Sequence, residues 1–198
     1  MSYQISSIKD KAPSSGTKYL LDTNIWYYIL EGTSKDYQGL YLDFFDAIKN
    51  FSGSPKPKVV LPTTVLSEII NRLLRDIRFR EFKDNPDNLE KIAGIEERRI
   101  YKDVYRNDEQ FRIDYRSICN DIKSFHYILE FVGDEFETFR IKDILSNPPL
   151  NLDFNDFIIT KIAKKNNFTI VTDDADFLVE DINIITANNK LIKKSTNL

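Results

Sequence analysis

The sequence predicts an α/β fold in which helices cover both faces of a central parallel sheet. Runs of apolar and β-branched residues at 18–21, 58–61, 168–172 and 182–186 have the length and composition of buried strands. The segments between them repeat apolar residues every three or four positions, as amphipathic helices do. Strands that alternate with helices are typical of a parallel sheet. An apolar content of 41% is ample for a packed core.

The first half of the chain supplies two strand–helix units. The strand at 18–21 precedes a helix that we predict from residue 24 to residue 30, and a second helix follows over 37–51. The strand at 58–61 precedes Pro62, which suits the first turn of a further helix because its missing N–H is not needed there.

The middle of the chain, at about 79–149, is rich in charged and aromatic residues and contains no obvious strand. We predict one helix over 89–105. A second predicted helix has an apolar face made of Ile118, Ile122, Phe125, Leu129 and Val132. We therefore expect a helical insertion here, and the strand–helix pattern resumes with a helix over 153–165.

The length of 198 residues fits one domain. We expect residues 1–16 to be a flexible N-terminal arm, because they are polar and contain no stretch typical of a secretory signal. Residues 17–198 are then a single domain that includes the insertion. No apolar run has the length of a membrane span. The single cysteine, Cys119, cannot form an internal disulfide, which favours a cytoplasmic location.

Acidic residues follow the predicted strands at four places. Asp22 and Asp174 come at the ends of two strands, Glu68 lies in the helix after another, and Asp156 lies near the start of a helix. Parallel strands end along one edge of a sheet, so we expect these carboxylates to converge. Carboxylates in such proximity repel one another. One or two Mg²⁺ or Mn²⁺ ions, which prefer oxygen ligands, would relieve that repulsion.

Each acid also has an interpretation without a metal. Asp22 could cap the helix that follows it, and Glu68 could be an ordinary solvent-exposed helical residue. Asp153 and Asp156 are three positions apart, and Asp153 is most simply an N-cap with Asp156 in the first turn. The apolar residues around Glu68 favour a buried position, where a carboxylate needs a partner.

These motifs resemble those of PIN-domain nucleases, a family that includes VapC-type toxin ribonucleases. The resemblance rests on Leu20-Leu21-Asp22-Thr23-Asn24, Ser67-Glu68-Ile69, Asp156-Phe157-Ile158-Ile159-Thr160 and Val171-Thr172-Asp173-Asp174-Ala175-Asp176-Phe177. It covers residues 18–78 and 150–187 and leaves out the middle segment. It implies a PIN-like three-layer α/β/α sandwich and metal-dependent hydrolysis of RNA phosphodiester bonds. The implied catalytic and metal-binding residues are Asp22, Glu68, Asp156 and Asp174.

The resemblance also suggests supporting residues around these acids. It implies that Thr23 and Asn24 support the site through hydrogen bonds, and its register selects Asp174 as the fourth acid. Supporting roles then remain for Asp153 as a cap or secondary ligand, for Asp173 and Asp176 as loop, cap or outer partners, and for Thr172 as a hydrogen-bond donor to a ligand.

The sequence gives weaker indications of the residues that contact a substrate. Arg72 and Arg75 are three positions apart, so on a helix they can share a face and bind phosphates. The alternative is a solvent-exposed face that pairs with Asp76 and Glu81. The formal net charge of −3 includes the candidate ligands, so it is permissive for a nucleic acid without favouring one.

The expected partners are RNA, an antitoxin protein that could cover the acidic groove, and a second copy of the chain, as the resemblance implies. The main alternative is a non-catalytic PIN-like scaffold that binds RNA or protein. A haloacid-dehalogenase-like phosphatase would need an aspartate where Asn24 stands. A response-regulator receiver domain would need an acidic pair where the chain has Asp22-Thr23.

Overall fold

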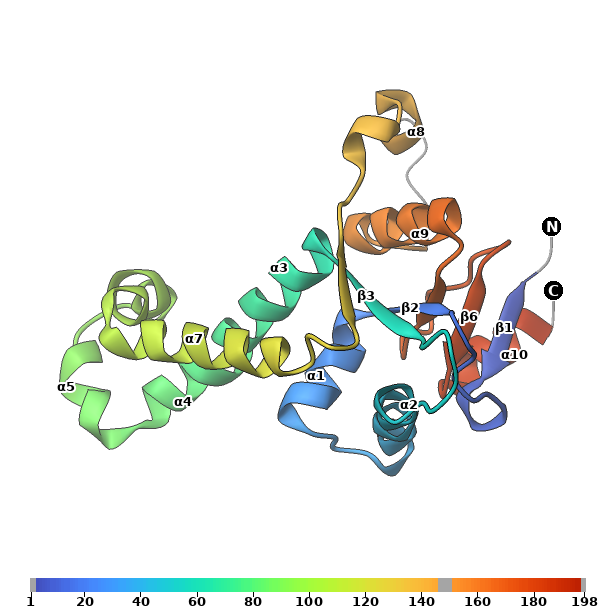
Figure 1. Cartoon of the computed structure of the whole chain (residues 1–198). Helices are drawn as coiled ribbons and strands as arrows, with labels where there is room; N and C mark the ends of the chain where they lie inside the picture. The colour runs from blue at the N-terminus through green and yellow to red at the C-terminus, as the bar shows by residue number, and fades with distance from the viewer. Residues whose placement is uncertain (1–2, 146–150, 197–198) are drawn as a thin grey trace. The chain divides into compact units, whose positions relative to one another are not determined.

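The structure of the chain is a computed structural model that describes residues 3–145 and 151–196 (Figure 1). It divides into two compact units. The first comprises Met1–Leu66 together with Tyr127–Leu198, and the second comprises Ser67–His126. Each unit is considered by itself below.

The first unit is built on a six-stranded sheet in which every pair of neighbouring strands is parallel. Its strands are β1 (Gln4–Ser7), β2 (Lys18–Leu21), β3 (Lys58–Pro62), β4 (Leu129–Val132), β5 (Thr169–Val171) and β6 (Asn183–Thr186). They lie in the order β1-β6-β5-β2-β3-β4. The predicted α/β fold with a central parallel sheet is confirmed.

Helices cover the sheet on both sides. Within the described part of the first unit the α-helices are α1 (Thr23–Glu31), α2 (Gly39–Lys49), α8 (Ile141–Leu145), α9 (Phe154–Asn166) and α10 (Asn189–Thr196), and α3 (Thr63–Arg72) begins directly after β3. Figure 1 shows α9 on one side of the sheet and α1 and α2 on the other. Crossovers between parallel strands are right-handed in nearly all proteins. The chain moves from β2 to β3 in one direction and from β5 to β6 in the other, so the helices are expected on opposite faces.

The core of the first unit lies where the central strands meet the helices. Leu20, Val60 and Ile170, on β2, β3 and β5, are completely buried. Strands covered on both faces are apolar throughout, which is why these segments were recognisable in the sequence. Trp26 of α1 and Tyr41 of α2 are also almost inaccessible to solvent.

The second unit is helical and carries its own aromatic core. After the end of α3 it contains a π-helix (η3, Leu73–Arg78), α4 (Phe79–Asp84), η4 (Pro86–Asn88), α5 (Leu89–Ile92), α6 (Glu97–Arg99), η5 (Ile100–Val104), η6 (Tyr105–Asn107) and α7 (Glu109–Ser124). Tyr105 is completely buried at the centre and lies 5.1–5.7 Å, between ring centroids, from four other aromatic rings. Its hydroxyl donates to the buried Asp114 carboxylate at 2.6 Å.

Three predicted elements differ in the structure. The helix expected over 89–105 is broken into short pieces, and Gly94 at φ 74° lies in the gap. The helix expected to continue through Val132 ends at Ser124, and residues 129–132 form β4 at the sheet edge, so the segment at 79–149 is not wholly helical. Pro62 ends β3 rather than opening α3.

The N-terminal segment also differs from the prediction. Residues 4–7, expected within a flexible arm, form the edge strand β1, which pairs with β6 from Gln4 opposite Asn183 to Ser7 opposite Thr186. A short 3-10 helix (η1, Ile8–Asp10) follows and buries Ile8. Backbone hydrogen bonding to β6 orders a segment whose polar side chains gave no strand pattern.

Across the described residues, no helix combines the length and the apolar character that a membrane crossing requires.

Candidate active site

The reversal in strand order places the candidate site. The chain leaves β2 toward β3 on one side and leaves β5 toward β6 on the other, so the sheet order reverses between β2 and β5. Open α/β sheets bind ligands at such a point, outside the carboxyl ends of the strands. Leu21 pairs with Val171 there, and the Asp22 N–H donates to the Val171 carbonyl at 2.9 Å. Asp22 and the segment that begins at Thr172 therefore lie side by side.

Hydrogen bonds from neutral groups fix the Asp22 carboxylate. Asp22 is 4% exposed, and its Oδ2 accepts from the Thr172 hydroxyl at 2.9 Å and from the Asn24 amide at 3.3 Å. Asp22 stands at the N-cap position of α1, yet its side chain makes no capping hydrogen bond. The capping interpretation therefore does not explain this aspartate. Thr23 is buried beside it at the start of α1.

Thr172 links Asp22 to the loop that carries Asp174. Thr172 is completely buried, and its hydroxyl, which donates to Asp22, also accepts the Asp174 backbone N–H at 2.9 Å. The Asp174 Oδ1 in turn accepts the N–H of Asp176 at 2.8 Å. Asp176 is exposed and pairs with Lys194 of α10 at 3.0 Å. The structure thus brings Asp22, Thr172 and Asp174 together and places Asp176 farther out, at the surface.

Three tyrosines surround Asp173, and sequence reasoning missed all three as site residues. The hydroxyls of Tyr28 and Tyr37 donate to Asp173 Oδ2 at 2.8 and 3.2 Å, and Tyr41 lies 3.0 Å from Oδ1. Burial raises the pKa of Tyr28 and of Tyr41 far above the ordinary tyrosine value, and the Asp173 charge raises them further. The tyrosines therefore stay protonated and act as donors. Asp173 is held by this cluster as an anchor for the loop.

Tyr41 is the most connected of the three. Besides Asp173, its hydroxyl lies 3.0 Å from the Thr172 carbonyl and 3.3 Å from the Thr186 hydroxyl, and it accepts the Ala187 N–H at 2.8 Å. One hydroxyl therefore connects the segments that follow β5 and β6. In the sequence Tyr41 stands among apolar residues of its predicted helix, and nothing in that pattern indicates a polar partner about 130 positions away.

The Asp153–Asp156 pair forms the N-terminus of α9. Asp153 is the N-cap, and its Oδ1 accepts the Asp156 N–H at 2.9 Å. The capping role predicted for Asp153 is confirmed. Asp156 lies in the first turn, where the helix dipole stabilises an anion.

The second unit carries the remaining predicted residues. Glu68 is partly exposed on α3, and its Oε1 lies 3.9 Å from Arg72 Nη1. Arg72 Nε also lies 3.9 Å from Asp76 Oδ2, as the alternative of a solvent-exposed, paired face expects for this arginine. Arg75 lies within the π-helix, and its guanidinium is 5.7 Å from the centre of the Tyr101 ring.

The oxygen donors at this edge suit a hard cation in their chemistry. Asp22 and Asp174 offer carboxylate oxygens, and the Thr172 hydroxyl connects the Asp22 carboxylate to the Asp174 backbone N–H. Within residues 3–145 and 151–196, no three carboxylate, histidine or cysteine side chains are close enough to one another to form a metal site.

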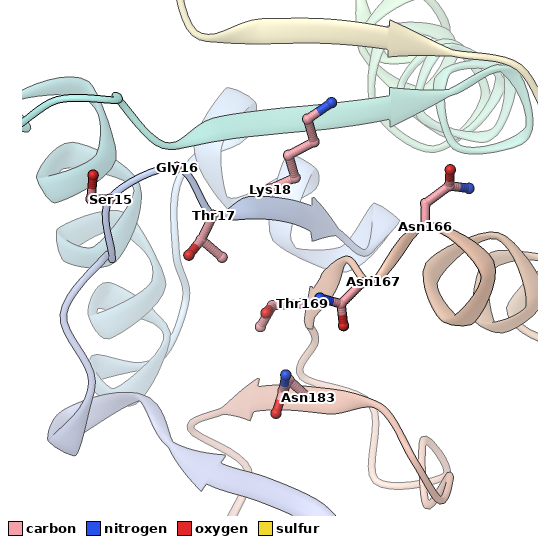
Figure 2. Close-up of a pocket in the computed structure, with 8 residues that line it drawn as sticks. All are labelled: Ser15, Gly16, Thr17, Lys18, Asn166, Asn167, Thr169 and Asn183. Carbon is pink, nitrogen blue, oxygen red and sulfur yellow. The ribbon is translucent and has the colours of Figure 1, made fainter.

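A polar cavity of about 460 Å³ lies at the other ends of the strands, where β2, β5 and β6 begin (Figure 2). Its lining includes Lys18, Thr169 and Asn183, which begin β2, β5 and β6. Asp22 and Asp174 follow the other ends of these strands. Because ligands of open α/β sheets bind at the carboxyl ends of the strands, the acidic edge is the candidate active site and this cavity is not.

The chain is similar to a known protein family and to solved structures. The family model described as the PIN domain matches residues 19–183. Among solved structures, VapBC2 from Rickettsia felis bound to a promoter DNA fragment is similar over 86% of this chain and 98% of its own, with 16% identity and a TM-score of 0.49. PAE2754 from Pyrobaculum aerophilum is similar over 93% and 99%, with 12% identity and a TM-score of 0.45. No curated protein matches the chain.

Proposed function

The chain belongs to the PIN-domain family, whose members are generally nucleases, and on this premise we propose that it is a metal-dependent endoribonuclease that hydrolyses RNA phosphodiester bonds. One observation carries the proposal. The buried Asp22 carboxylate lies at the carboxyl end of β2, and its orientation is fixed by the hydroxyl that also holds the Asp174 backbone. A buried carboxylate whose geometry is set by neutral donors is suited to binding a cation.

In this proposal the metal would be held by carboxylates of the first unit, with Asp22 and Asp174 at the ends of β2 and β5 and Asp156 in the first turn of α9. Because the described residues contain no preformed group of three ligands, the metal would have to draw these side chains together. Glu68 lies in the second unit, and its part in the site stays a prediction from the sequence. When bound, Mg²⁺ or Mn²⁺ would supply positive charge to the phosphate and lower the pKa of the attacking water. The protein's own part is to orient these carboxylates, and Thr172 and Asn24 do so for Asp22.

The supporting residues act through position rather than by contact with substrate. Asp153 caps α9 and so fixes the backbone that carries Asp156. The tyrosine cluster on Asp173 holds the start of the loop that carries Asp174. This division assigns adjacent aspartates, Asp173 and Asp174, to different tasks.

Cleavage of a mixed RNA pool tests the proposal. Wild-type protein with Mg²⁺ or Mn²⁺ should cut RNA, and cleavage should be lost in EDTA and in Asp22→Ala. Asp176→Ala is the matched control, because Asp176 lies in the same region but is exposed and paired with Lys194. It should cleave at close to the wild-type rate. Asp22→Ala protein that is folded and cuts as fast as wild type would refute the site.

The non-catalytic alternative makes a different prediction. A PIN-like scaffold would bind RNA equally well in wild type and Asp22→Ala, with no cleavage and no Mn²⁺ binding by calorimetry. A toxin role, with an antitoxin as partner, adds a test in cells. Expression of the wild type should arrest growth, and expression of Asp22→Ala should not.

A further inference from the structure

A small cavity borders helix α9 close in sequence to two of the candidate acids. Its volume is about 220 Å³, and it is lined by Asn151, Leu152, Phe157, Thr160, Lys161, Lys164, Leu178 and Val179. Phe157 directly follows Asp156 on α9, and Leu178 follows Asp174 by four positions. The walls of the cavity are therefore continuations of the two elements that present these acids.

The lining combines an apolar floor with positive charge at the rim. Leu152, Phe157, Leu178 and Val179 supply apolar surface, and Phe157 is only 8% exposed. Among the described residues of the lining, Lys161 and Lys164 are charged and none is a carboxylate. An occupant with a flat apolar part and a negative part would complement this lining.

The two lysines are placed to meet a negative group. The ammonium of Lys161 lies 5.1 Å from the centre of the Phe157 ring, within the range of a cation–π contact. Lys164 is exposed one turn farther along α9. Asp143, whose pKa is lowered by its hydrogen bond to Arg140 and by the charges of Arg140, Lys142 and Lys161, is already paired with Arg140 at 2.6 Å.

The size of the cavity limits the occupant. Pockets for drug-sized ligands have volumes of roughly 300–1,000 Å³, so 220 Å³ suits a single ring system. A nucleobase is flat and largely apolar on its faces, and the phosphate attached through its sugar is negative. A nucleotide therefore matches both the floor and the rim. An acidic peptide matches the charge, but it has no reason to lie beside the candidate catalytic acids.

We propose that this cavity binds one base of the RNA strand beside the bond to be cut, with the neighbouring phosphates on Lys161 and Lys164. The inference rests on the proposed nuclease function and adds a specificity-determining subsite to it. The base that the cavity accepts would then determine the nucleotide beside which the RNA is cut.

Nucleotide binding can be measured without cleavage. In EDTA, each of the four nucleoside monophosphates is added to protein with labelled methyl groups, and the methyl signals of Leu152, Leu178 and Val179 are followed by NMR. At least one nucleotide should shift these signals at millimolar concentration. Absence of shifts with all four nucleotides would overturn the proposal. So would shifts produced only by an acidic peptide, which would assign the cavity to a protein partner.

The rim lysine has a matched control. Lys164→Ala should weaken binding of a short single-stranded RNA several-fold and lower the slope of log affinity against log salt by about 0.7, the value for one phosphate contact. Lys193→Ala, which removes an exposed lysine of α10, should change neither. Equal effects of the two substitutions would show general charge attraction and refute the subsite.

A cavity-filling change separates this inference from the proposed function. Val179→Trp should change which nucleotide flanks the cuts in a sequenced RNA pool, because it occupies the cavity. If wild type cleaves and Val179→Trp keeps the same cut-site preference, the subsite is wrong and the nuclease proposal stands. If wild type cleaves no RNA but nucleotides still shift the methyl signals, the nuclease proposal fails and the nucleotide cavity stands.

Discussion

Replacing Tyr41 with phenylalanine removes a single oxygen from the centre of the loop-anchoring cluster. Tyr41 is 1% exposed, and its hydroxyl has four polar neighbours in Thr172, Asp173, Thr186 and Ala187 at 2.8–3.3 Å. The ring of phenylalanine fills the same space, so packing is retained. The change therefore isolates the contribution of the hydroxyl.

The expected loss of stability follows from the hydrogen bonds that the hydroxyl makes and from the groups left unpaired when it is removed. A hydrogen bond to a charged group such as Asp173 contributes about 1.5–3 kcal/mol, and a buried donor such as the Ala187 N–H costs about 1–3 kcal/mol when it loses its acceptor. One hydroxyl donates to only one acceptor at a time, so the losses overlap. We expect Tyr41→Phe to lower the free energy of unfolding by about 3 kcal/mol.

The other two tyrosines provide graded controls. Tyr28 is partly buried and makes one hydrogen bond to Asp173 at 2.8 Å, so Tyr28→Phe should cost about 1.5 kcal/mol. Tyr37 is 38% exposed and its bond is longer, at 3.2 Å, so Tyr37→Phe should cost less than about 0.5 kcal/mol. Urea unfolding of the three variants measures whether their losses of stability follow this order. Equal losses for Tyr37→Phe and Tyr41→Phe would refute the reasoning.

The same variants report on function. A partner that orients a ligating segment typically contributes about 10–100-fold to metal affinity or activity. Tyr41→Phe should therefore lower Mn²⁺ affinity within that range under conditions where the protein remains folded, and Tyr37→Phe should not. If Tyr41→Phe lost stability but bound Mn²⁺ as tightly as wild type, the cluster would be structural only.

The cluster also predicts a loss of stability at alkaline pH. An unfolded tyrosine loses its proton at a pKa of about 10, and in the folded state burial raises the pKa of Tyr28 and Tyr41 above that value. The stability that these two tyrosines contribute is therefore fully present below pH 10. It is lost as the pH rises toward the pKa that each has in the folded state. Tyr105 in the second unit, whose pKa burial also raises, acts in the same direction. Unfolding free energies from pH 8 to 11 should fall, and the fall should be shallower in Tyr41→Phe; an unchanged slope would contradict this.

Two further predictions concern the residues that orient the candidate ligands. Thr172→Val should cost about 1–3 kcal/mol, because it removes the Thr172 donor to Asp22 and leaves the Asp174 N–H without this acceptor, and Thr172→Ser should restore most of the stability in urea unfolding. Asp153→Ala should cost about 1 kcal/mol through loss of the N-cap. Asp153→Asn should keep both stability and cleavage, whereas Asp156→Ala should lose cleavage; loss of cleavage in Asp153→Asn would reverse these roles.

The sequence predicted the central strands well because both of their faces are buried. Lys18–Leu21 and Lys58–Leu61 were predicted to within one residue of β2 and β3. The edge strands were missed for the opposite reason. Each has one neighbour, so fewer of its side chains need to be apolar, and Phe131 on β4 is even 68% exposed. Leu129 and Val132 were also compatible with the spacing of a helix, so periodicity alone could not separate the two structures.

Some residues of the candidate site could likewise be predicted from the sequence, and others could not. The position of Asp22 could be predicted because a buried strand delivers it directly to the sheet edge. The cap at Asp153 was readable from its local pattern. The anchor at Asp173 could not be predicted, because its partners come from helical segments more than 130 positions earlier in the chain. A tyrosine on an amphipathic helix is equally compatible with the core, and only the fold shows where its hydroxyl is.

The donors described around Asp22 and Asp173 have a common character that bears on cation binding. They are hydroxyls and one amide, from Thr172, three tyrosines and Asn24. Neutral donors stabilise a buried carboxylate without cancelling its charge, whereas an arginine or lysine would supply the positive charge that a metal ion provides. The tyrosines can therefore order the start of the loop without placing a positive charge on Asp173. Because Asp173 is occupied by the tyrosines, its neighbour Asp174, whose backbone N–H is held by Thr172, is the better candidate ligand.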